Sequence, residues 1–283
     1  MLGLVGACGI KAESPPAAAK PAAADRNAPP SGERTEANTT PDNGAASVDN
    51  ATPSSADEET RSEQNGLGTV ANAPPDVKGF DCFFRVTEQA KELASSGYGF
   101  AVRYVPLDSS KPNLTREEIE AILDAGLALM IVQEGAGFKD QKPTRQLGAF
   151  NGTNASKYAR ELGYPPKAML WVDVEAVEDG TAQDVFEYVS AWASAVSPLY
   201  TPGLYVGEDI KLSDEQLSRL PIEHFWRAGA DHHEVPSGRG FQLIEHGHSQ
   251  VAGLTVDDDL TQDDKDGGSV LWLQPRGWKA PTS

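Results

Sequence analysis

The stretch AMLWVDVEA, residues 168–176, decides the fold and indicates where its chemistry lies. It is an apolar run of strand length that ends on two acids, Asp173 and Glu175. Side chains alternate between the two faces of a strand, so Trp171 and both acids share one face and the valines share the other. Valines suit the face covered by helices, and the acids therefore point the opposite way, with Cα atoms about 6.5 Å apart. At this spacing, burial and the charge of one carboxyl can keep the other protonated, so that it can donate a proton.

Apolar runs and segments of helical periodicity alternate after residue 79, which is typical of a parallel sheet covered by helices. Thr115 followed by Glu118, and Ser213 followed by Gln216, predict two helix starts. We expect an α/β fold, a (β/α)8 TIM-type barrel, irregular in its C-terminal third, where helical patterns fade. The alternative is an open doubly wound sheet, but the first run is not followed by a glycine-rich phosphate loop. The eight runs span residues 79–84, 99–106, 128–135, 168–176, 203–207, 224–229, 241–247 and, more weakly, 253–260.

The N-terminal part of the chain differs sharply in composition from the rest. The nine Phe, seven Tyr and five Trp residues all lie from Phe80 onward, whereas residues 9–78 are rich in Ala, Pro, Ser and Thr. Such a segment buries too little apolar surface to offset the entropy lost on ordering. We therefore expect a disordered linker over residues 9–78 and one folded domain over residues 79–283.

Residues 1–8, MLGLVGAC, are similar to the end of a bacterial lipoprotein signal, in which small residues precede a lipidated cysteine. On this interpretation Cys8 carries the lipid, and the protein is exported and held at the membrane or cell envelope by a flexible tether. A positively charged start and a long apolar stretch are missing, so a chance cluster of small residues is the alternative. Cys82 is expected to be a small buried hydrophobe rather than a disulfide partner.

The net charge of −18 limits the classes of partner. Nucleic acids and anionic lipid headgroups are bound by clustered Lys and Arg, so neither is expected as a partner. Membrane contact is expected only through the lipid anchor. The acidic balance suits a neutral or cationic ligand, or solubility alone.

Further acids stand at the ends of the other apolar runs, where barrel enzymes carry their active sites. Asp81 ends the first run, Glu134 the third, and Asp257 or Asp259 the last. Four aromatic residues at the same level are suited to stack on sugar rings, with plain core packing as the alternative: Tyr104, Trp171, Tyr205 and Trp226.

The chain from Gly79 to about Leu260 resembles a bacterial glycoside-hydrolase-like barrel domain of unknown function found in exported proteins. That domain in turn looks like the Chalaropsis-type lysozymes, which are barrel muramidases. The features that carry the resemblance are GFDCF, the Arg103-Tyr104 pair in AVRYVP, LTREEIEAILDAGLALMIVQE, WVDVEA and GLYVG.

The resemblance implies roles for the acids. Asp81 matches the first-strand Asp of the muramidases, Asp173 and Glu175 match their D-x-E, and Asp257 or Asp259 matches their last-strand Asp. Glu175 is then the proton donor, and Asp173 assists the acetamido group of the substrate or acts as nucleophile. The residues expected to contact substrate are Arg103, Tyr104, Glu134, Trp171, Tyr205 and Trp226.

Three hypotheses for function follow. The first is an exported glycoside hydrolase that acts without a cofactor on an amino-sugar cell-wall polymer, peptidoglycan. The second is a glycan-binding module that keeps the acids without turnover. The third is a metal-dependent hydrolase, because His246 and His248 with Asp231 would suit zinc. Loop histidines without a metal are more common, and the acidic run 257–268 lacks the ordered EF-hand pattern, so we expect no metal.

Overall fold

The computed structural model describes residues 66–105, 113–134, 138, 141–175, 177–207, 210–229 and 239–281. All of them belong to one compact unit, Pro53–Ser283. Cys8, the expected signal remnant and all but the last thirteen residues of the expected linker lie outside the described residues.

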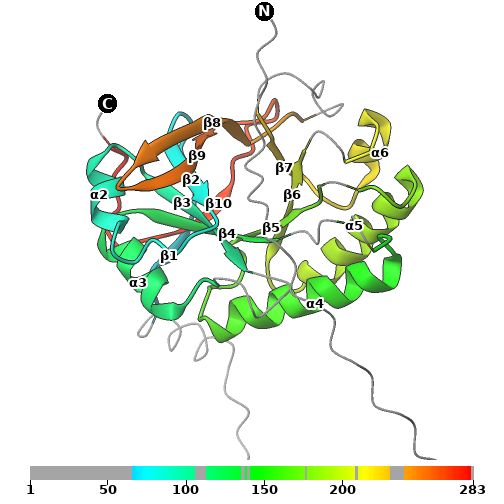
Figure 1. Cartoon of the computed structure of the whole chain (residues 1–283), viewed down its shortest axis with the longest axis horizontal. Helices are drawn as coiled ribbons and strands as arrows, with labels where there is room; N and C mark the ends of the chain where they lie inside the picture. The colour runs from blue at the N-terminus through cyan, green and yellow to red at the C-terminus, as the bar shows by residue number, and fades with distance from the viewer. Residues whose placement is uncertain are drawn as a thin grey trace, which may run out of the picture. The chain divides into compact units, whose positions relative to one another are not determined.

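Eight strands close into a barrel, which confirms the predicted α/β barrel (Figure 1). Hydrogen bonding between β4 and β5 closes the sheet, and every predicted apolar run forms one of the eight strands. The strands are β2 (Lys78–Cys82), β3 (Phe100–Val105), β4 (Ala128–Gln133), β5 (Met169–Asp173), β6 (Thr201–Val206), β7 (His224–Arg227), β8 (Leu243–Val251) and β9 (Leu254–Thr261).

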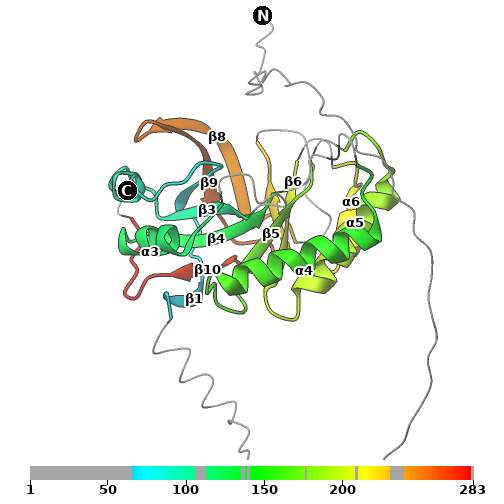
Figure 2. The same ribbon diagram turned by 60° about the horizontal axis from the view of Figure 1, so that its bottom comes forward.

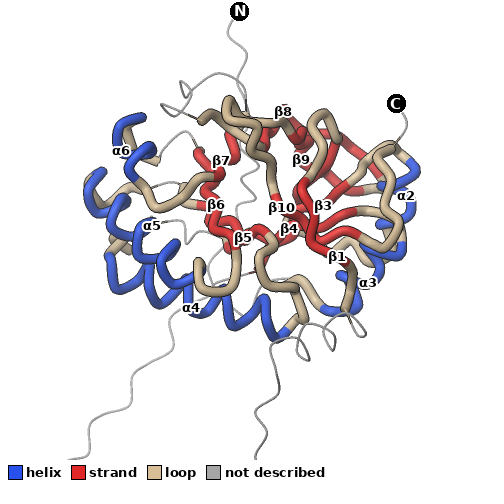
Figure 3. The backbone as a smooth tube through the Cα atoms, turned by 180° about the vertical axis from the view of Figure 1, so that it is seen from behind, coloured by secondary structure: helices blue, strands red, loops and turns tan. Residues whose placement is uncertain are grey.

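Helices connect the first six strands and cover the outside of the barrel (Figure 3). Four of them begin at a Thr or Ser whose side chain accepts a backbone N–H of the first turn. Ser213 and Gln216 form the predicted capping box, and α4 and α5 lie side by side (Figure 2). Thr115 caps α3, but Glu118 turns away from it toward β3. The helices are α2 (Ala90–Ser95), α3 (Arg116–Asp124), α4 (Arg145–Glu161), α5 (Ala182–Val196) and α6 (Asp214–Arg219).

The C-terminal third is irregular, as predicted. β8 follows β7 in parallel, with no helix in the described part of their connection, and then folds back through a hairpin into β9. β9 is antiparallel to both β8 and β2. The last strand of the barrel thus runs opposite to the regular (β/α)8 direction, because a hairpin of two residues can join only antiparallel strands.

Two short strands outside the barrel pair with each other. β1 (Thr69–Asn72) is antiparallel to β10 (Leu271–Gln274), and β10 joins β4 through Leu273 and Leu129. β1 precedes Gly79, where the sequence places the start of the folded domain. Its sequence, TVAN, contains neither an aromatic residue nor a long apolar run, so composition does not distinguish it from the segment before it.

The barrel interior is filled by large apolar side chains, and a Cβ would find no space beside them at Gly79 or at Gly203. Phe100, Met130, Met169 and Trp171 belong to this inner cluster, and a separate outer cluster packs between strands and helices. A Cβ at Gly203 would lie 2.2 Å from Cε3 of Trp171, so only glycine fits beside that ring. Within the described residues, none of the helices is long and apolar enough to cross a membrane.

We expect Gly203→Ala to lower the free energy of unfolding by about 1–3 kcal/mol, because the added methyl overpacks the barrel against Trp171. Chemical denaturation measures this loss. The same substitution in a Trp171→Phe background should cost less, since the shorter ring frees the space. Equal costs in both backgrounds would contradict the packing explanation.

Candidate active site

Carboxyl groups from several strands meet at the end of the barrel where β2 and β5 finish. Asp81 of β2 lies directly opposite Asp257 of β9 in the strand register. The charges of Asp257 and Glu245 both act on Asp81, and that of Asp81 acts on Asp173. Antiparallel β9 thus contributes Asp257 from its first half, whereas β2 and β5 contribute Asp81 and Asp173 at or next to their last residues.

Asp81 is buried at the centre of this group and is only 3% exposed. The hydroxyl of Tyr104 donates a hydrogen bond of 2.9 Å to its Oδ1. Burial raises the pKa of Asp81 well above its ordinary value, and the negative charges of Asp257 and Glu245 raise it further. The bond from Tyr104 opposes the shift without cancelling it.

Asp173 and Glu175 lie in different surroundings although they are only two residues apart. Asp173 is half-buried, and its Oδ1 has no hydrogen-bond partner among the described residues. Burial and the neighbouring charge of Glu175 raise the pKa of Asp173 well above its ordinary value. Glu175 is exposed, and a Cβ at Gly207 would lie 3.2 Å from both its Cγ and its Oε1. Because Gly207 has no Cβ, the side chain of Glu175 is not crowded at this point.

Glu245 of β8 is an acid of the site that the sequence analysis did not single out. The hydroxyl of Tyr205 donates a hydrogen bond of 2.7 Å to its Oε2. Burial raises the pKa of Glu245 to about 7, and the charges of Asp257 and Glu175 add to the shift against the bond from Tyr205. The signal was present in FQLIEHG, where Leu243 and Glu245 alternate with Ile244 as Trp171 and Asp173 alternate with Val172.

The two candidates for the last-strand acid occupy different depths on one face of β9. Asp257 is level with Asp81 and half-buried. Asp259 pairs with Gly79, one layer deeper, and is 1% exposed. Its Oδ1 accepts a hydrogen bond of 2.9 Å from Nε1 of Trp226, and burial raises its pKa well above the ordinary value. Asp257 is therefore the acid at the level of the mouth.

The family model described as an Rv2525c-like, glycoside hydrolase-like domain matches residues 91–264, more than half of the chain. The chain belongs to this family. Membership confirms the resemblance expected from the sequence, and the domain is glycoside-hydrolase-like. None of the curated proteins matches the sequence.

Solved structures share the fold at low identity. An uncharacterized B. stearothermophilus protein is 22% identical over 66% of this chain and 96% of its own, with a TM-score of 0.52. The Mycobacterium tuberculosis Tat-secreted protein Rv2525c, in complex with L-tartrate, is 16% identical over 66% of this chain and 96% of its own, with a TM-score of 0.50. The modular autolysin LytC from Streptococcus pneumoniae, in complex with a synthetic peptidoglycan ligand, is 9% identical over 66% of this chain and 46% of its own, with a TM-score of 0.51. At these identities the likeness shows the fold alone.

The aromatic residues expected at the site divide by depth. Trp171 and Trp226 are 0% and 1% exposed and contact each other inside the barrel, with ring centroids 5.9 Å apart. They belong to the packed interior, the alternative that the sequence left open. Tyr104 and Tyr205 are only partly buried and bring their hydroxyls to the acids. Glu134 follows β4 by one residue and is also partly exposed at this end.

Arg103 lies on the other face of β3, away from the barrel mouth. It is fully buried against α3, where its Nε is 2.8 Å from Oε1 of Glu118. Its Nη1 also donates a hydrogen bond to the carbonyl oxygen of Cys82. Contact of Arg103 with substrate, expected from the sequence, does not fit this position, since side chains alternate and Tyr104 takes the inward face.

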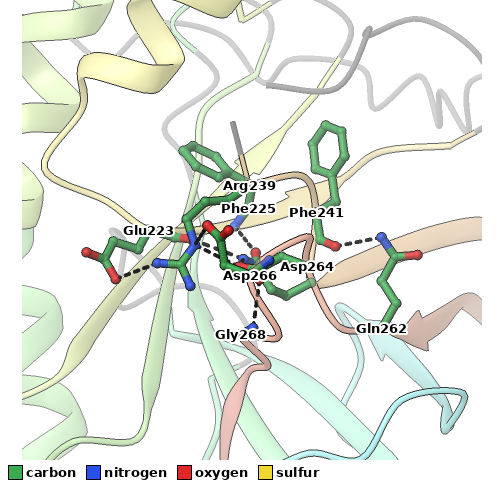
Figure 4. Close-up of polar contacts among 9 residues, drawn as sticks. Glu223, Phe225, Arg239, Phe241, Gln262, Asp264, Asp266 and Gly268 are labelled. Carbon is green, nitrogen blue, oxygen red and sulfur yellow. Dashed lines mark hydrogen bonds and ion pairs between the residues drawn. The ribbon is translucent and has the colours of Figure 1, made fainter. Parts of the chain in front are cut away.

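Metal ligands do not converge among the described residues. No group of three or more His, Cys, Asp or Glu side chains there is arranged to hold a metal ion. Asp231, His232 and His233 lie outside the described residues. In the acidic run 257–268, Asp264 accepts hydrogen bonds from Nε of Arg239 and from the backbone N–H groups of Asp266 and Gly268 (Figure 4). It also accepts one from Nε2 of Gln242. A guanidinium thus takes the place beside Asp264 that a cation would need.

We expect stability to depend on pH through Glu245. Between its ordinary pKa of 4.5 and the value of about 7, the folded protein keeps a proton that the unfolded chain releases. Raising the pH through this window therefore lowers the free energy of unfolding. Glu245→Gln has no proton to release, so its decline over the same window should be shallower, as measured by denaturation at a series of pH values.

Glu215→Gln is the matched control, because the side chain of Glu215 is 83% exposed on α6. This variant should follow the wild-type curve. A decline in Glu245→Gln as steep as that of the wild type would show that Glu245 titrates normally in the folded protein.

Proposed function

We propose that this protein is an exported glycoside hydrolase that acts on an amino-sugar cell-wall polymer, peptidoglycan. Glu175 serves as the general acid and Asp173 assists. The observation that carries the proposal is the contrast within this pair: the exposed carboxyl of Glu175 stands beside the half-buried carboxyl of Asp173, whose pKa is raised, at the end of the barrel where β2 and β5 finish. Two carboxyls in unlike environments are what acid-assisted glycoside cleavage needs.

Glu175 is suited to meet the glycosidic oxygen because it is exposed and Gly207 leaves it room to turn. A bound sugar would remove water from its carboxyl and favour the protonated form, with the neighbouring acids acting in the same direction. The leaving oxygen takes the proton of Glu175 as the glycosidic bond breaks, and positive charge develops on the sugar ring. Surrounding carboxylates such as Asp257 stabilise that charge electrostatically. Water then adds to the ring carbon and gives up a proton to a carboxylate, which completes the hydrolysis.

Asp173 is suited to orient the substrate. Its Oδ1 has no hydrogen-bond partner among the described residues, and a protonated carboxyl can both donate and accept. An acetamido group, with one N–H and one carbonyl, matches this capacity. Asp81 stays further inside, held by Tyr104, and shapes the potential felt by Asp173.

Peptidoglycan and an extracytoplasmic location are supported by the proteins of similar fold. LytC is an autolysin whose structure contains a synthetic peptidoglycan ligand, and Rv2525c is Tat-secreted. Lipidation of Cys8 would place the domain at the membrane surface with a spacer long enough to reach the polymer above it. Mass analysis of the mature N-terminus from its native cell envelope tests the lipid.

We expect Glu175→Gln to reduce release of new reducing ends from peptidoglycan by roughly 100- to 10,000-fold, the usual contribution of a general acid. The amide keeps the shape of the side chain but cannot donate the proton. Glu178→Gln, at an exposed glutamate on the same connection, is the control and should leave the rate unchanged. The rate is measured as reducing ends released by the purified full-length protein, and mass analysis identifies the products.

Two results would change the proposal. Undiminished release by Glu175→Gln would remove Glu175 as the acid. Saturable binding of peptidoglycan by the wild type, without product over long incubation, would favour the glycan-binding module instead.

A further inference from the structure

We infer that Phe84 is a stacking platform for a sugar ring of the bound glycan, forming a subsite beside the acids. The inference rests on the proposed glycan substrate and adds a place where a second part of the polymer is held. Phe84 lies in the connection that leaves the carboxyl end of β2, two residues after the strand ends at Cys82.

Phe84 is exposed, yet it is continuous with the site. Its side chain is 55% exposed. Its ring contacts Phe83, with centroids 6.3 Å apart, and Phe83 contacts Tyr104 at 6.0 Å. The hydroxyl of Tyr104 in turn bonds to Asp81. A row of three aromatic rings therefore leads from the buried acid to solvent.

The backbone around Phe84 is held by buried polar groups. Cys82 donates its thiol to the carbonyl oxygen of Phe84 at 3.2 Å, and Arg103 donates to the carbonyl oxygen of Cys82. Glu118 accepts the backbone N–H of Val86 at 2.8 Å and pairs with Arg103. The buried ion pair thus fixes residues 82–86 from both ends. A ligand that stacks on Phe84 meets an already ordered loop and avoids most of the entropic cost of ordering it.

Phe150 is an exposed aromatic residue away from the site and serves as a comparison for Phe84. It is 63% exposed on α4, outside the barrel. Single exposed apolar residues are ordinary on protein surfaces. Phe84 differs because its ring continues a row that ends at the acids, and because a buried ion pair fixes its loop.

The ring of Phe84 and the acids of the site together fit a neutral sugar. The apolar face of a pyranose ring packs on an aromatic face, and its hydroxyl groups remain free to bond with carboxyls. Phe84 offers the apolar face, and its ring is connected to Asp81 through Phe83 and Tyr104. A sugar stacked on Phe84 would lie on the β2 side of the site, outside Tyr104 and Asp81.

Titration calorimetry of the full chain with soluble peptidoglycan fragments and chitin oligomers tests the inference. Phe84→Ala should bind roughly ten- to a hundredfold more weakly, the range expected for loss of a buried aromatic contact. Phe84→Trp should bind at least as well as the wild type. Phe84→Leu keeps apolar bulk without a flat ring and should also bind more weakly. Phe150→Ala is the control and should match the wild type.

The kinetic readout separates a stacking subsite from a structural role. Phe84→Ala should raise KM for glycan cleavage with little change in kcat, and its thermal unfolding should match that of the wild type. Unchanged affinity in both Phe84→Ala and Phe84→Leu overturns the inference, as does a loss of kcat at unchanged KM. Cleavage that survives Glu175→Gln overturns only the assignment of the acid. Absence of glycan binding by the wild type overturns both proposals.

Discussion

Strand β9 pairs with β8 on one side and with β2 on the other, and the closed barrel depends on this double pairing. Without it, β2 would be an open edge, and the interior packed around Phe100 and Trp171 would be exposed on that side. The pairing also sets the register of the site. Asp257 comes to lie opposite Asp81 because the two strands run in opposite directions. The stability of the barrel and the geometry of its acids thus depend on the same hydrogen bonds.

Closure brings like charges together, and burial raises the pKa of three of these carboxyls. Asp81, Asp173 and Asp259 each have a pKa well above the ordinary value, with burial as the main cause in every case. Hydrogen bonds from Tyr104 and Trp226 recover part of that cost. A cluster of this kind lowers stability as the pH rises, yet it holds protons where a reaction can use them. Natural proteins commonly concentrate such local conflicts at functional sites.

The buried ion pair of Arg103 and Glu118 connects helix α3 to the loop that follows β2. The sequence predicts that Glu118 pairs with Thr115 at a helix start. In the structure its carboxylate instead joins α3 to β3 and to the loop after β2. A buried ion pair adds little net stability, because the loss of hydration offsets the attraction. Its clearest effect here is to fix the position of the 82–86 loop.

Much of the fold followed from the sequence alone. Alternation in AMLWVDVEA identified a strand with Asp173 and Glu175 on one face, and eight apolar runs identified eight strands, because both patterns are local consequences of backbone geometry. The direction of β9, the depth of Trp171 and Trp226, and the part played by Glu245 were decided only in the folded chain. These features depend on which distant segments pair and how far each side chain extends into the barrel. Arg103 is the intermediate case: alternation assigns it to the face opposite Tyr104, but its partner Glu118 became apparent only when α3 packed on β3.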